Sequence, residues 1–474
     1  MSLHRKKIIS QLMDQSTEST NGLKRTLGAG NLIALGIGAI IGAGLFVRTA
    51  AASAEAAGPA VTLSFVVAAI GCALAGLCYA EFASMIPIAG SAYTYAYATM
   101  GELVAWIIGW SLILEYALGA ATVAIAWSEY MNKLLGGVIP FEWCHSPFEG
   151  GYMNFPALIV LLLVTLLLIR GTSESAKVNA VIVFVKVAIV LIFIILGWQF
   201  ILPENHTPYL IPADAIGHEG IFKHGWGGVL GGAGIVFFAF IGFDAVSTAA
   251  QEAKNPKKDM PIGILGSLAI CTLLYILFSH VLTGVANWKE FATAGKEASV
   301  TFAIDTYMKG YGWLSKSITI AILAGFTSVI LVMLMGQSRV FYSMANDGLL
   351  PSLFSDLHKK YRTPFKSNWI LLVFVGAFAA FVPGSVAGDL TSIGTLFAFI
   401  LVCVGVLILR KSDPKLVRPF KTPLVPFVPL LGILVCAAMI ISLPAQTQLS
   451  ALFWMVIGLI VFFSYSRKRS KLHV

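Results

Sequence analysis

Apolar residues along this chain form long runs separated by short segments rich in lysine, arginine, glycine and proline. A helix needs about 20 apolar residues to cross the hydrocarbon core of a bilayer. The runs therefore predict an all-α membrane protein with twelve transmembrane helices. These spans are expected at 28–54, 60–86, 101–131, 155–171, 177–202, 229–250, 260–286, 315–344, 368–382, 387–409, 423–443 and 448–466.

Composition supports the membrane class, because 58% of the residues are hydrophobic, 12% are charged and the mean hydropathy is +0.84. A soluble domain of this length would expose far more apolar surface than water tolerates. The net charge of +9 comes with no basic stripe interleaved with aromatic residues, which argues against nucleic acid as a partner. The polar N-terminal segment lacks the apolar core of a signal peptide.

The positive charge is distributed unevenly between the two sets of loops. Most of the 32 lysine and arginine residues fall in the loop set that includes both chain ends. The positive-inside rule then predicts a multi-pass protein of the cytoplasmic (inner) membrane with both termini in the cytoplasm.

Two spans carry glycine interruptions at related places, Gly36–Gly44 in the first and Phe237–Asp244 in the sixth. A separation of five spans predicts an inverted repeat, and interrupted helices at matching places point to a transporter's central site. Tight helix packing through small residues is the alternative reading. The expected organisation is a cytoplasmic segment 1–27, a first repeat 28–202, a second repeat 229–409, helices 11 and 12 at 423–466, and a cytoplasmic tail 467–474.

A broken helix leaves backbone groups that need partners inside the membrane. The carboxylate of a zwitterionic amino acid suits the N–H groups of Gly42, Ala43 and Gly44 at the start of a half-helix. Its ammonium group suits free carbonyls near the two breaks. The substrate-binding residues expected from this argument are Ile40, Ile41, Gly42, Ala43, Gly44, Phe238, Ala239 and Ile241. Phe238 is either a gate over the substrate or a core residue.

Ionisable residues inside spans are costly and are usually functional. Lys186 lies mid-span, where burial disfavours a charged amine, so it is a candidate for proton coupling. The alternative is a charged lysine that caps backbone carbonyls. Glu115 either attracts a cationic substrate or bonds a neighbouring helix, and Asp244 either meets a basic group or caps a half-helix. Arg48, near a span end, is interpreted as a structural or gating residue.

Several motifs are missing from the sequence. It contains no C-x-x-C pair, no H-E-x-x-H and no G-x-x-x-x-G-K-[ST], so we expect no metal, no cofactor and no ATP-driven pump. No nucleophile–base pair is visible, so we expect a protein that is not an enzyme.

The chain resembles the amino acid–polyamine–organocation superfamily, and within it the bacterial cationic amino-acid transporter (CAT-like) branch, over nearly its whole length. The motifs that carry this resemblance are Gly36–Gly44, Gly90–Tyr93 with Gly101 and Glu102, Phe237–Asp244, Asn255 and Pro256 with Met260–Ile264, and Arg339 with Asp347–Pro351.

The resemblance implies a LeuT-type five-plus-five inverted repeat with two further C-terminal helices. It also implies proton symport without sodium, with Lys186 at the sodium-equivalent position, Phe238 as a gating aromatic, and Glu115 and Asp244 at acidic positions of the branch. Ala43 and Ser111 depart from the pattern, in which a threonine and an aspartate are frequent. The lost acid keeps a small neutral amino acid such as alanine open beside a cationic one.

The sequence therefore predicts import of L-amino acids by proton symport and alternating access. An amino-acid exchanger is the alternative, and a transporter-like nutrient sensor is disfavoured by the short tails. The expected partners are the L-amino acid, the proton and the lipid bilayer, with no nucleic acid. Whether a small membrane subunit joins the chain stays open.

Overall fold

The computed structural model describes residues 7, 27–86, 88, 90–170, 175–293, 299–359, 361 and 363–471. The expected N-terminal segment lies outside the described residues apart from Lys7 and Leu27. The last three residues of the expected C-terminal tail also lie outside them.

Helices make up nearly all of the regular structure in the described part of the chain. The α-helices are α2 (Ala29–Ile40), α3 (Thr49–Ala52), α4 (Val61–Met85), α5 (Ser91–Thr99), α6 (Glu102–Leu112), α7 (Gly119–Leu134), α8 (Phe155–Arg170), α9 (Ser175–Gly197), α10 (Gly225–Val236), α11 (Ala245–Thr248), α12 (Pro256–Val285), α13 (Ser299–Tyr307), α14 (Gly312–Asn346), α15 (Phe365–Phe381), α16 (Gly384–Ser412), α17 (Phe427–Ser442), α18 (Ala445–Val461) and α19 (Arg467–Arg469).

Within the described residues, eight helical segments are long and apolar enough to cross a membrane, and four apolar helices are shorter. The long segments are Gly44–Met85, Glu102–Leu134, Ala180–Phe200, Gly225–Thr248, Pro256–Val285, Gly312–Asn346, Gly384–Ser412 and Ala445–Arg469. The short ones are α2, α8, α15 and α17. The first long segment joins parts of two expected spans, and its helical geometry is interrupted at Gly58, where φ is +58°.

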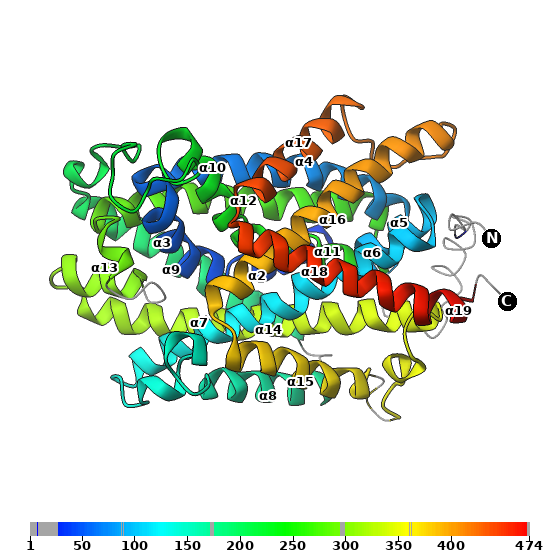
Figure 1. Cartoon of the computed structure of the whole chain (residues 1–474), viewed down its shortest axis with the longest axis horizontal. Helices are drawn as coiled ribbons and strands as arrows, with labels where there is room; N and C mark the ends of the chain where they lie inside the picture. The colour runs from blue at the N-terminus through cyan, green and yellow to red at the C-terminus, as the bar shows by residue number, and fades with distance from the viewer. Residues whose placement is uncertain are drawn as a thin grey trace.

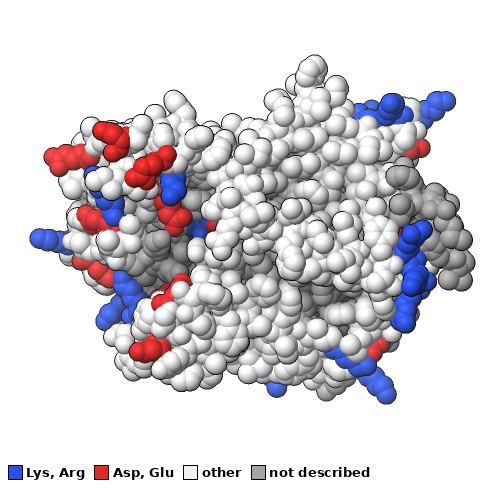
Figure 2. Space-filling model, in the orientation of Figure 1, with Lys and Arg blue, Asp and Glu red and all other residues white. Residues whose placement is uncertain are grey.

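The surface is that of a protein surrounded by lipid. Helices such as α8, α14 and α15 run along the long axis of the molecule (Figure 1). Charged side chains gather at its two ends, and the broad middle of the face in Figure 2 carries almost none. Large apolar side chains on several helices are exposed, including Phe184 of α9, Val373 of α15 and Phe453 of α18. These exposed apolar side chains are kept out of water only when lipid covers them.

The core of the bundle is built around the helices that carry the expected breaks. α12 packs against α4 and α2, and α14 packs against α7 and α9. The segment Gly225–Thr248 is the most deeply placed of the long apolar segments, with 94% of its most apolar window buried. A helix that is buried all round occupies the middle of a bundle.

One end of the molecule carries α19, and we call it the termini end (Figure 1). Leu27 pairs with Ala253 as an isolated parallel bridge, which places the entry to α2 beside the exit from α11. The Leu27 N–H donates to Glu252 O at 3.0 Å, and the Lys254 N–H donates to Leu27 O at 2.8 Å. Lys7 forms an ion pair with Asp347, at 2.5 Å, at this same end.

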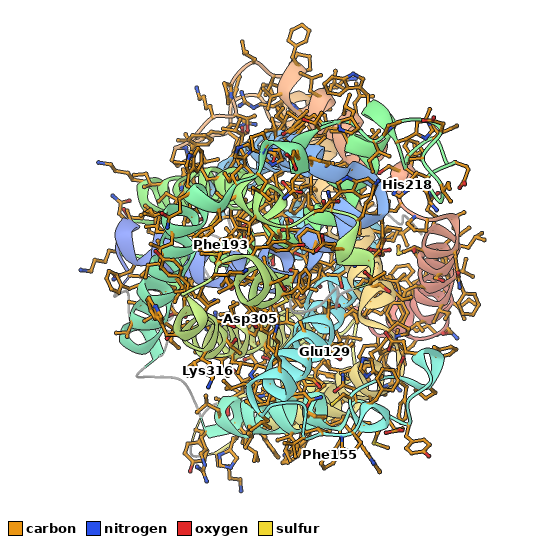
Figure 3. The ribbon with its side chains drawn as sticks, turned by 90° about the vertical axis from the view of Figure 1, so that its left-hand side faces the viewer. Glu129, Phe155, Phe193, His218, Asp305 and Lys316 are labelled. Carbon is orange, nitrogen blue, oxygen red and sulfur yellow. The ribbon has the colours of Figure 1, made fainter. Side chains whose placement is uncertain are left out.

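Figure 3 views the opposite end, where Glu129 of α7, Asp305 of α13 and Lys316 of α14 are labelled. There Lys133 of α7 forms a partly exposed ion pair with Asp305 of α13 at 3.4 Å.

Candidate functional site

The first expected break lies between α2 and the helical segment that follows it. α2 ends at Ile40, Ile41 is extended with φ −72° and ψ 105°, and a π-helical turn begins at Gly44. The local sequence alternates glycine with small or branched residues, and glycine is a poor helix former. The N–H groups of Gly42, Ala43 and Gly44 stand at the start of the second half-helix, where backbone donors lack intrahelical acceptors.

The second break lies between α10 and α11. α10 ends at Val236, a tight helical turn covers Phe237–Phe240, and Ile241 is extended with ψ 134°. Gly242 follows with φ +113°, a conformation that side chains with a Cβ rarely adopt. Glycine is therefore required where the chain turns into α11.

The two breaks are in direct contact. A Cβ placed on Gly44 would lie 2.1 Å from the Cα of Ala239, so only a glycine lets the two backbones approach this closely. Phe238 is 4% exposed and Ile41 is fully buried. The expected binding residues of the two helices are thus brought together in a closed arrangement.

Lys186 of α9 reaches the carbonyl side of the first break. Its Nζ donates to Gly38 O at 2.8 Å and to Ile41 O at 2.9 Å, and its side chain is buried. A Cβ on Gly325 of α14 would lie 2.7 Å from the lysine Cε, so that glycine makes room for the side chain. The contacts are those expected of a lysine that caps carbonyls of a broken helix.

Tyr275 of α12 connects the two breaks. Its hydroxyl lies 2.9 Å from both Ile40 O and Ala239 O, within donating distance of each. The carbonyls of Ile40 and Ala239, which the sequence argument took to be free for a substrate ammonium, therefore already have this donor. A carbonyl has a second lone pair, so each retains one acceptor position.

Glu115 and Asp244 are neighbouring, fully buried carboxyl groups. Glu115 lies in a π-helical turn, Ile113–Leu118, between α6 and α7. Asp244 accepts a short hydrogen bond from the Tyr116 hydroxyl and a 3.4 Å bond from Ser91. Within the described residues, both Glu115 oxygens and Asp244 Oδ1 have no hydrogen-bond partner. The two carboxyl groups form a buried polar cluster next to the second break, and no basic side chain in the described part of the chain is bonded to Asp244.

On the side away from the termini end, a small cavity of about 40 Å³ reaches the first break. Ala43, Val47, Glu55 and Thr122 are among its lining residues. Arg48 also lines it and forms a buried ion pair with Asp389 of α16. The pair fastens the first helix to α16 directly beside this path.

At the termini end, Glu81 of α4 is the centre of a buried ionic cluster. Arg410 of α16 donates to both of its oxygens at 3.0 and 2.8 Å, and Arg418 donates at 3.1 Å. The Thr422 N–H completes the set at 2.8 Å. With every carboxylate oxygen bonded, the cluster fixes α4 to the segment that follows α16.

Sequence reasoning did not predict Tyr275, Gly325 or Asp389 as parts of this region. The one available signal was polarity, because Tyr275 is a hydroxyl-bearing residue inside an apolar run. The roles of Gly325 and Asp389 depend on contacts between distant helices.

Comparison with known proteins gives consistent matches over the whole chain. A family model described as "Amino acid permease" matches residues 27–463. A "Branched-chain amino acid permease BcaP" of Bacillus subtilis (strain 168) is 44% identical, with 100% of this chain and 99% of that protein aligned. A "Methylthioribose transporter" of the same organism is 41% identical over the same shares. A vacuolar "Cationic amino acid transporter 4" of Arabidopsis thaliana is 34% identical over 87% of this chain and 68% of its own. All three are transporters by name rather than enzymes.

Proposed function

Because this chain belongs to the amino acid permease family, we propose that it is a secondary active transporter that imports L-amino acids by proton symport and alternating access. The expected fold is a LeuT-type repeat of residues 28–202 and 229–409, followed by helices 11 and 12. The observation that carries the proposal is the contact between two broken helices in the middle of an apolar bundle.

The proposed orientation places the termini end in the cytoplasm. At this end Lys254 lies just before α12, Lys257 and Lys258 lie in its first turn, and a further basic run follows α16. An excess of lysine and arginine marks the cytoplasmic side of a membrane protein. In a bacterial cell this is the cytoplasmic (inner) membrane.

The substrate's two charged ends would bind the two kinds of backbone group at the breaks. The carboxylate takes the N–H groups of Gly42, Ala43 and Gly44, with the positive end of the half-helix adding to the attraction. The ammonium takes remaining acceptor positions on Ile40, Ala239 and neighbouring carbonyls. Phe238 is the proposed gate over the bound amino acid.

We propose a substrate with an uncharged, small or branched aliphatic side chain. A Cβ on Gly42 would lie 3.0 Å from a methyl carbon of Val329 on α14, so an apolar side chain lines the break there. An apolar wall recognises a hydrocarbon side chain and leaves a charged one poorly solvated. The printed function of the B. subtilis branched-chain permease agrees with this choice.

Lys186 is the proposed coupling residue. Its ammonium bonds two carbonyls of the first helix, and a charge-assisted hydrogen bond is roughly twice as strong as a neutral one. Loss of the proton would weaken the hold on α2 and favour its movement. The gradient can then bias the transport cycle, because the two protonation states prefer different conformations.

The test is uptake of labelled valine and alanine into proteoliposomes with an inward proton gradient. The wild-type protein should accumulate the amino acid, whereas Lys186→Met should bind it but lose the dependence on the gradient. Gradient-driven accumulation by the variant would overturn the coupling role. Uptake that needs an internal amino acid and ignores the gradient would assign the exchanger function instead.

A further inference from the structure

An open cavity of about 500 Å³ lies at the termini end, and no residue of either helix break lines it. Its lining comes from the first turns of α12 and from the segment after α16. The lining residues are Lys257, Lys258, Pro261, Ile262, Leu265, Gly266, Pro419 and Phe420. No step of the proposed transport cycle uses this cavity.

The mouth of the cavity is basic. Lys257 and Lys258 are both exposed, and they stand in the first turn of a helix of 30 residues. The N-terminus of such a helix adds a partial positive charge. The acid of this turn, Asp259, accepts the Asn255 N–H at 3.0 Å and is not part of the lining. The mouth therefore favours an anion.

The inner walls of the cavity are apolar and continue into the lipid-facing side of α12. Ile262 in the cavity is 40% exposed, and Ile270 and Leu273 farther along the helix are 41% and 61% exposed. These positions recur at helical spacing and so form one outward stripe. An occupant with its anionic part at the lysines can extend an apolar part along this stripe into the bilayer.

We propose that this cavity binds an anionic glycerophospholipid of the leaflet at the termini end, with its phosphate at Lys257 and Lys258. A free anion would use the lysines and leave the apolar walls unoccupied, whereas a neutral lipid would leave the charges unpaired. Basic pockets at the membrane boundary are suited to acidic headgroups. The proposal goes beyond transport and does not depend on which amino acid is carried.

The position of the cavity gives the lipid a route to the moving parts of the protein. A Cβ on Gly266 would lie 3.1 Å from a side-chain carbon of Ile33, so the cavity floor backs directly onto α2. α2 is the half-helix that ends at the first break. A bound lipid therefore supports α2 from behind and resists its displacement toward the membrane.

The test is native mass spectrometry of the purified full chain titrated with phosphatidylglycerol or phosphatidylcholine. We expect a saturable phosphatidylglycerol adduct and weak phosphatidylcholine binding. The double variant Lys257→Ala/Lys258→Ala should lose about thirtyfold in phosphatidylglycerol affinity, since each lysine near an anionic surface contributes a factor of about five. Lys411→Ala/Lys415→Ala removes two exposed charges near the same end and should bind like the wild type.

A second variant, Ile262→Asn, tests the apolar wall without changing charge, and it should weaken phosphatidylglycerol binding while binding of inorganic phosphate stays the same. Equal losses in the two lysine double variants would overturn the proposal in favour of diffuse surface charge. Complete displacement of the lipid by inorganic phosphate would assign a small-anion site instead. Because the readout is lipid binding, a negative result leaves the transport proposal standing.

Discussion

Replacing Tyr275 with phenylalanine removes a single hydroxyl group that serves both broken helices. In the structure this hydroxyl lies 2.9 Å from Ile40 O and 2.9 Å from Ala239 O. The phenylalanine ring keeps the packing of the buried side chain, including its contact with Phe65 at a centroid distance of 5.4 Å. The substitution therefore isolates the hydrogen bonding between the breaks.

The expected cost follows from the burial of both carbonyls. A buried polar group left without its partner costs about 1–3 kcal/mol. The hydroxyl has only one proton to share between the two carbonyls. We therefore expect the free energy of unfolding to fall by roughly 2 kcal/mol, which is the cost for one carbonyl and not for two. A change of this size shifts an equilibrium about thirtyfold.

The assay is the thermal unfolding of the detergent-purified protein, read by intrinsic fluorescence. We expect Tyr275→Phe to lower the midpoint by roughly 2–5 °C. Tyr79→Phe is the matched control, because the Tyr79 side chain is equally buried and its hydroxyl has no hydrogen-bond partner among the described residues. Removing an unpaired buried hydroxyl should leave the midpoint unchanged or raise it slightly.

Two outcomes would refute the reasoning about Tyr275. If Tyr275→Phe unfolds at the same midpoint temperature as the wild type, the hydroxyl does not hold the breaks together. An equal fall in Tyr79→Phe would mean that the loss reflects any buried hydroxyl in this bundle.

Two further substitutions test the close approach of the breaks and the buried ionic cluster around Glu81. Gly44→Ala should reduce amino-acid binding at least tenfold in a scintillation-proximity assay, because its Cβ would lie 2.1 Å from the backbone of Ala239 at the second break. Gly30→Ala, whose Cβ would meet nothing within 4 Å, should bind the amino acid normally, and equal binding by the two variants would contradict this reasoning. Glu81→Gln should destabilise the protein by about 3–5 kcal/mol by leaving Arg418 buried without its counter-charge. Asp356→Asn, which removes an exposed ion pair, should cost under about 1 kcal/mol in the same unfolding assay, and similar losses in both would argue against a structural role for the cluster.

The membrane class and the helix ranges were predictable from the sequence because lipid requires long apolar runs. The helices follow the expected spans closely, although α14 extends to Gly312–Asn346 where 315–344 was expected. Leu314 and Ala345 in these added turns are buried against the rest of the bundle, so packing extends the helix past the apolar run. The short helices α5 and α13 were not expected, since neither contains a run long enough to indicate a span.

The expected interruptions of the first and sixth spans appear at Ile41 and Ile241, where glycine-rich sequence makes a continuous helix costly. The sequence also indicated that Lys186 is placed mid-span. It did not indicate which groups the lysine bonds, because that depends on how α9 packs against α2. The substrate, gating and coupling roles of these residues stay predictions.

Side-chain contacts between helices that are far apart in the chain could not be predicted from a single sequence. Arg48 and Asp389 are 341 positions apart, and their ion pair exists only because α16 packs beside the first helix. An acid near the end of an apolar run is also typical of a helix at the water boundary, so Asp389 carried no specific signal. The sequence did not distinguish Gly325 from the other glycines among the 45 in the chain, because its role depends on the contact with the Lys186 side chain.

The backbone bridge between Leu27 and Ala253 has a mechanical consequence for any opening of the termini end. It joins the chain just before α2 to the chain just after α11 through two hydrogen bonds. A displacement of one segment must therefore carry the other along or break both bonds, at about 1 kcal/mol each. The bonds thereby join α2 to α11, one half of each broken helix, and the motion of lower free-energy cost is a concerted one.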